Sequence, residues 1–251
     1  MDNFPRDCIF EILLLLNPKG LLLAAQISDD FNCLCHLESL WRNLVENRYN
    51  TLLIENSSFK TYKLCYQLHS LKEKIKYDGT LEKLYTKQDI YLTNNQLQEL
   101  PKSIGLLTNL QKLSLYGNQL KNLPVEISML TNLRQLCLAN NCLKILPGEI
   151  YKLTKLEKLW MYGNGLEELS SEIGQLADLQ ELSISHNSLK KLPKEIWNLT
   201  NLQKLMLWNN LLSELPKEIC QLTNLQYLVV GDKFKESLPE LNQLRNLRTL
   251  T

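Results

Sequence analysis

The sequence has little that would mark a nucleic-acid binder or an enzyme that uses nucleotides or metals. Its charges nearly cancel, with 28 basic and 27 acidic side chains among 251 residues. No net field therefore attracts DNA, RNA or an anionic membrane. The nine glycines are scattered and form no phosphate-binding loop, and no HExxH metal motif occurs. We expect no cofactor, no metal site and no nucleic-acid partner.

Paired cysteines and long apolar runs are also missing. The seven cysteines are odd in number, include no CxxC pair and mostly occupy apolar positions. We therefore expect free thiols in a reduced, cytoplasmic compartment rather than a disulfide framework or a zinc site. The apolar stretch CIFEILLLL is short, contains Glu11 and follows Asp2 and Asp7. We expect neither a signal peptide nor a membrane span there.

A regular repeat dominates the rest of the chain. An asparagine recurs every 23 residues after the same leucine spacing, at Asn95, Asn118, Asn141, Asn164, Asn187 and Asn210. Each belongs to an LxLxxNxL frame such as LSLYGNQL, and LPxxI segments such as LPKEI lead into the next frame. Leucines two residues apart share one face of a strand. A fixed period of this kind predicts a solenoid whose units bury aliphatic side chains against their neighbours.

Two further positions in each unit have predicted structural roles. The asparagine stands where the strand bends into a turn, and a buried amide there can satisfy backbone groups that the strand ladder leaves unpaired. We favour this role over ligand binding. The proline of LPxxI lacks an N–H and favours an extended or short helical return. Ser170 replaces that proline in one unit, which we interpret as drift.

With these frames, residues 86–251 resemble the leucine-rich repeat family. The resemblance implies an α/β fold in which parallel strands line the concave face of a solenoid. The near-identical LPKEI and LTNLQ segments are also similar to repeats common in bacteria and giant viruses. This leaves open a secreted effector that acts in a host cytosol.

The first fifty residues do not repeat. Their apolar spacing predicts short amphipathic helices, with breaks at Asn17-Pro18 and near Ser28. On this evidence alone they form a helical cap over the open end of the solenoid. Residues 51–85 are predicted to hold a linking helix, with Leu68, Leu71 and Ile75 on one side.

The order of residues in the first fifty, from Phe4-Pro5 to Leu40-Trp41, resembles the F-box motif. That resemblance implies docking on a Skp-type adaptor, which links the chain to a cullin ubiquitin ligase while the repeats capture a target. The adaptor-facing residues would be Phe4, Pro5, Ile9, Ile12, Leu16, Pro18, Leu21 and Leu22. The alternative is a scaffold, or an enzyme inhibitor, whose N-terminal helices only cap the solenoid. Apart from the complex, we expect a monomer.

The concave face is the candidate target site. When the repeat leucines point inward, the side chains between and beside them point outward, and large aromatic residues gather there. An exposed aromatic patch is typical of a protein interface, although aromatics also fit a pleated sheet. The predicted target-binding residues are Tyr116, Trp160, Tyr162, His186, Met206, Trp208 and Tyr227.

Catalysis is not expected. Ser183, Ser185 and His186 lie close together in the sequence, but the pattern places no acid and no oxyanion donor beside them. We therefore predict a binding protein with no catalytic residues.

Overall fold

The computed structural model describes residues 67–68, 70–231, 234 and 244–250. The chain divides into two units, Met1–Tyr85 and Thr86–Thr251. The predicted F-box helices at residues 1–50 lie outside the described residues. So do all the predicted adaptor-facing positions: Phe4, Pro5, Ile9, Ile12, Leu16, Pro18, Leu21 and Leu22.

The first unit contributes two helical stretches to the described part. Residues 67–68 and 70–74 are helical, and the apolar spacing predicted there is observed, since Leu68, Leu71 and Ile75 are buried. Helix α6 (Leu81–Tyr85) follows and was not predicted. The Thr80 hydroxyl accepts the Lys83 N–H at 3.3 Å, so a threonine cap starts this short helix.

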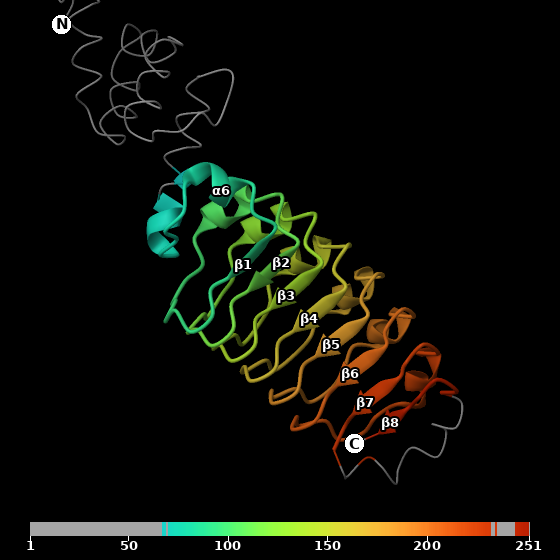
Figure 1. Ribbon diagram of the computed structural model, residues 1–251. Coiled ribbons are helices and arrows are strands. Elements are labelled where there is room, and N and C mark those ends of the chain that lie inside the picture. Colours follow the sequence, from blue (N-terminus) through green and yellow to red (C-terminus); the bar gives the residue numbers. More distant parts are fainter. Residues whose placement is uncertain (1–66, 69, 232–233, 235–243, 251) are drawn as a thin grey trace, which may run out of the picture. The chain divides into compact units, whose positions relative to one another are not determined.

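The second unit is a solenoid of parallel strands. Its strands pair strictly in sequence order in one eight-stranded sheet, as Figure 1 shows. Leu113 of one strand pairs with Leu136 of the next, so the register advances by one whole repeat at each step. The predicted parallel-strand solenoid is confirmed. The strands are β1 (Asp89–Tyr91), β2 (Lys112–Ser114), β3 (Gln135–Cys137), β4 (Lys158–Trp160), β5 (Glu181–Ser183), β6 (Lys204–Met206), β7 (Tyr227–Val229) and β8 (Thr249–Leu250).

Short 3-10 helices form the return segments on the convex side. In the first of them the Ile104 N–H donates to the Pro101 carbonyl at 2.9 Å, and the same bond recurs in the following units. Of the two forms predicted for the return after the proline, extended or short helical, the structure has the short helix. The helices are η1 (Lys102–Leu106), η2 (Val125–Met129), η3 (Gly148–Lys152), η4 (Ser171–Gln175), η5 (Lys194–Asn198) and η6 (Lys217–Gln221).

The core lies between the strands and these returns. Strand leucines such as Leu136 and Leu138 are fully buried, as is Ile150 of the following return. At about 1.5–3 kcal/mol per buried aliphatic side chain, one unit buries too little surface to fold alone. Stability therefore comes from stacking each unit on its neighbours.

Five of the six repeated asparagines form a ladder of hydrogen bonds at the ends of the strands, in which Asn118, Asn141 and Asn187 are buried and Asn164 and Asn210 are half-buried. The Asn118 amide Nδ2 donates to the carbonyls of Leu92 and Leu115, at 2.6 and 2.9 Å. Its Oδ1 accepts the N–H of Leu97 at 3.0 Å. Corresponding bonds recur at Asn141, Asn164, Asn187 and Asn210. The predicted structural role of these asparagines is confirmed.

A second asparagine ladder, which the sequence analysis missed, runs along the turns before the strands. Asn132 Nδ2 donates to the Thr108 carbonyl at 3.0 Å, and Asn201, Asn224 and Asn246 make the equivalent bond in later units. These bonds are exposed, so each contributes less than its buried counterpart.

Ser170 has a defined role, so the interpretation of it as drift was wrong. Its hydroxyl caps η4 by accepting the Glu172 N–H at 3.2 Å. The neighbouring Tyr151 is buried, and this burial raises its pKa to about 12.

We expect Asn141→Ala to lower the free energy of unfolding by about 2–3 kcal/mol, because it leaves buried backbone groups unpaired. The matched control is Asn132→Ala in the exposed ladder, which should lose less than about 1 kcal/mol. Urea denaturation measures both values. Equal losses would contradict the assignment of the inner ladder as the stabilising one.

We expect Ser170→Pro to cost about 0.5–2 kcal/mol, because it removes the hydroxyl that caps η4. The backbone there already has φ −65° and ψ 147°, so proline fits sterically and loss of the cap is the main change. The matched control is Ser170→Thr, which keeps a hydroxyl that can accept the Glu172 N–H and should retain most of the stability. Denaturant unfolding measures both values, and equal losses would contradict the role of the cap.

Candidate binding face

The outward side of the strands, here called the concave face, carries most of the predicted target-binding residues. Trp208 is 43% exposed, whereas Tyr116, Trp160, Tyr162, Met206 and Tyr227 are half-buried. The expectation that Trp160, Tyr162 and Met206 are freely exposed was wrong. Each of them is only partly exposed to solvent.

Trp160 is held by charged neighbours on the same face. Its indole Nε1 donates to Glu181 Oε1 on the next strand at 2.9 Å. Lys158 Nζ lies 5.9 Å from the Trp160 ring centroid and 4.0 Å from Glu181 Oε2. The ring is thus fixed in place before any partner arrives. Glu181 was missed from sequence, although it precedes a strand leucine and alternation places it on this face.

Tyr116 and Tyr162 close the face over the strand between them. Their ring centroids are 6.4 Å apart with the planes tilted by 56°, and the buried Ala139 occupies the corresponding position on the intervening strand. Asn140 Nδ2 also donates to the Tyr116 hydroxyl at 2.9 Å. Desolvation raises the pKa of Tyr162, so its phenol stays neutral at physiological pH.

His186 lies at the edge of the face against Trp208. The two ring centroids are 4.0 Å apart in an edge-to-face arrangement, and Asn209 Nδ2 lies 2.6 Å from His186 Nδ1. The His186 backbone has φ +52°, in the left-handed region where the equivalent residue of other units is asparagine or glycine, as at Asn140, Asn209, Gly117 and Gly163. A histidine there is unusual and places a ring where most units have none.

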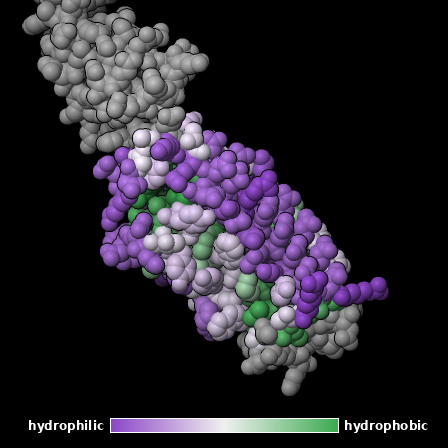
Figure 2. Space-filling view, in the orientation of Figure 1, coloured by the Kyte–Doolittle hydropathy of each residue, from purple (hydrophilic) through white to green (hydrophobic). Residues whose placement is uncertain are grey.

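A hollow of about 500 Å³ opens beside these rings. Ser183, at the end of β5, and Ser185, just after it, form its floor, and both are buried. It is lined by Asn140, Tyr162, Gly163, Ser183, Ser185, His186, Met206 and Trp208. In Figure 2 the surface over the strands is pale, between hydrophilic and hydrophobic, while the side of the short helices is mostly purple.

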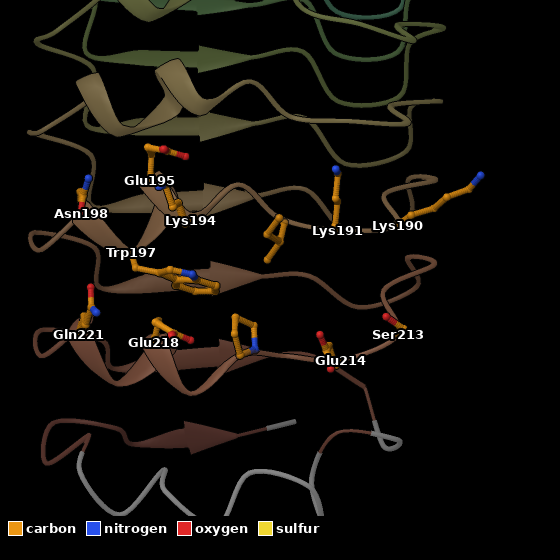
Figure 3. Close-up of a pocket in the computed structure, with 12 residues that line it drawn as sticks. Lys190, Lys191, Lys194, Glu195, Trp197, Asn198, Ser213, Glu214, Glu218 and Gln221 are labelled. Carbon is orange, nitrogen blue, oxygen red and sulfur yellow. The ribbon is translucent and has the colours of Figure 1, made fainter.

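A second hollow, of about 590 Å³, lies on the convex side around η5 and η6. Three lysines, Lys190, Lys191 and Lys194, line it together with Glu195, Glu214 and Glu218. Figure 3 shows the Trp197 ring lying flat between the two returns, with Lys190 directed away. The charges balance and Trp197 is buried, so this hollow offers a partner neither an exposed aromatic group nor a net charge.

The surroundings of His186, the thiols and the potential metal ligands are defined for the part of the chain that the structure describes. His186 Nδ1 faces Asn209 rather than a serine hydroxyl. Within the described ranges no three His, Cys, Asp or Glu side chains come together as metal ligands. No helix in that part is both long and apolar enough to cross a membrane. Cys137 and Cys142 are free thiols, and desolvation raises the pKa of Cys137, which keeps it protonated.

Known proteins that are similar to this chain are similar to its repeats. The family model described as "Leucine-rich repeat region" matches residues 41–188 and 164–251. No curated protein matches the chain. The structure of a leucine-rich repeat protein of Leptospira interrogans is 42% identical with a TM-score of 0.64, over 68% of this chain and 43% of its own length. This chain therefore spans less than half of that relative.

Two other solved structures share the fold. The leucine-rich repeat ectodomain of the Arabidopsis thaliana receptor kinase GASSHO1/SCHENGEN3, solved in complex with CASPARIAN STRIP INTEGRITY FACTOR 2, is 35% identical with a TM-score of 0.50. It matches over 53% of this chain and 17% of its own length. An internalin of Listeria monocytogenes is 19% identical with a TM-score of 0.54, over 73% of this chain and 61% of its own, and this likeness supports the fold alone.

Proposed function

We propose that this chain, which belongs to the leucine-rich repeat family, holds a partner protein on its concave face. The observation that carries the proposal is the group of aromatic and apolar side chains that the register gathers on one face between β2 and β6, namely Tyr116, Trp160, Tyr162, Met206 and Trp208. Adjacent strands are about 4.8 Å apart, so four strand steps span roughly 20 Å. This length suits a helix or loop of a protein.

The chemistry of this face also favours a protein partner. Tryptophan and tyrosine dominate the energetics of protein interfaces, and Trp160 is already oriented by Glu181. A ring that is fixed in advance loses less conformational entropy on binding. The receptor ectodomain from Arabidopsis, solved with its bound factor, is a relative in which repeats of this family occur in a complex.

The finer proposal is that the chain recruits a target to a ubiquitin ligase. It rests on the resemblance of residues 1–50 to an F-box, which would dock on a Skp-type adaptor and a cullin. The repeats would then hold the target near a ubiquitin-loaded enzyme in the cytoplasm, or in the host cytosol if the chain is a secreted effector. The rival is a scaffold or inhibitor that uses the same face without ubiquitin transfer.

For the concave face, we expect Trp160→Ala and Trp208→Ala each to weaken target binding by about 2 kcal/mol, roughly thirtyfold. The target is first identified by cross-linking in cells, and its affinity is then measured by calorimetry. The matched controls are Lys194→Ala and Glu218→Ala on the convex side, which should change binding little. If both tryptophan variants bind the target as the wild type does, the site lies elsewhere.

For the F-box, we expect a Pro5→Ala, Ile12→Asp double variant to lose co-purification with a Skp-type adaptor. The physical reason is that the aspartate would place a charge in an apolar adaptor interface. Circular dichroism should still report a folded solenoid. A wild-type chain that fails to bind the adaptor at micromolar concentration would favour the scaffold alternative.

A further inference from the structure

We propose that the hollow above Ser183 and Ser185 receives one tyrosine side chain of the partner protein, with its hydroxyl on Ser185. This inference rests on the proposed function, because it names the group by which the partner is anchored to the concave face. Three features of the hollow carry it: its width, its lack of charge and one unpaired oxygen.

The width follows from the register of the strands. Ser183 pairs with Trp160 on one side and with Met206 on the other, so two small residues form a floor between strands that carry large ones. The outer strands are about 9.6 Å apart, twice the strand spacing. A flat ring between two walls of side chains needs about 3.5–4.0 Å between its own atoms and the atoms of each wall. One aromatic ring therefore fits between the Tyr162 wall and the Met206–Trp208 wall, and two stacked rings do not.

Comparison with the earlier repeats shows why this place stays open. Above Ala139, Tyr116 and Tyr162 reach each other and close the gap. Above Ser185, the flanking rings are Tyr162 and Trp208, and Trp208 packs against His186 instead. Among the described residues Tyr162 and Trp208 make no ring contact, so the space between them stays free for a ring from a partner.

The lining selects an uncharged aromatic side chain. No Asp, Glu, Lys or Arg lines it, so a lysine or a carboxylate would be desolvated there without an acidic or basic partner. Tyr162 and Trp208 offer aromatic surfaces, and Met206 offers a thioether, which contacts rings favourably.

The unpaired oxygen distinguishes tyrosine from phenylalanine. Ser185 is 2% exposed, and its Oγ has no hydrogen-bond partner among the described residues. Buried hydroxyls normally have partners, and the corresponding residue above β3 is Ala139, so folding does not require an oxygen at this position. The Oγ has almost no accessible surface in the free chain, so a rotation about χ1 must turn it toward the hollow when a partner arrives. A phenol hydroxyl can both donate and accept, which then supplies the missing partner.

The test uses N-acetyl-tyrosinamide and N-acetyl-phenylalaninamide, which differ by one hydroxyl. The full chain is labelled with 13C at its four methionine methyls. Met206 lines the hollow and reports binding, while Met129, exposed on η2, is the internal control. We expect the tyrosine probe to shift Met206 and to bind about five- to tenfold more tightly than the phenylalanine probe.

Ser185→Ala is the matched variant. It should unfold at the same temperature as the wild type or higher, because it removes an unpaired polar atom. It should also bind the two probes with equal affinity. No shift of Met206 with either probe, equal binding of both by the wild type, or a preference that survives in Ser185→Ala would each overturn the proposal.

These results separate this inference from the proposed function. If Trp160→Ala and Trp208→Ala weaken capture of the target but the probes show no hydroxyl preference, the concave face binds a partner without a tyrosine anchor. If the probes behave as expected but those variants leave capture intact, the hollow binds phenols and the target binds elsewhere.

Discussion

The inner asparagine ladder is the constraint on which the rest of the solenoid depends. At the end of each strand the backbone turns away from its neighbours, and its N–H and C=O groups would be buried without partners. One side chain per unit satisfies groups in its own repeat and in the preceding one, as Asn118 does for Leu115 and Leu92. Because each amide bonds two units at once, it fixes the point at which every strand must end. A repeat of different length would separate the amide from its partners.

This common end point also determines the binding face. Because the strands pair in repeat register, equivalent side chains of adjacent strands lie about 4.8 Å apart. The shape of the face therefore depends on whether the side chains at adjacent positions are large or small. Small residues between large ones are either bridged, as Ala139 is beneath Tyr116 and Tyr162, or left as hollows, as Ser185 is. If the same aromatic residues followed one another in a different order, they would cover Ser185 as well.

Much of this architecture could be predicted from sequence, because the features of one unit reappear in each of the others. The inward leucines, the buried Asn141 and the short helix after Pro124 all follow from a single repeat. What could not be predicted depends on contacts between units. Trp160 is half-buried because Glu181, in the next repeat, accepts its N–H. These two residues are 21 positions apart rather than one 23-residue period, so comparing equivalent positions of successive repeats would not have paired them.

The separation of inward and outward positions explains how one scaffold can carry a particular binding face. Stability resides in leucines, turn asparagines and convex prolines, which are nearly the same in every unit. The outward positions vary from Ala139 to Trp208 without altering the strand register. A substitution on the face changes local contacts with the neighbouring units, whereas a substitution in the ladder removes bonds that join two units. Side-chain size on this face can therefore change with little effect on the fold, and the slot above Ser185 results from such a change.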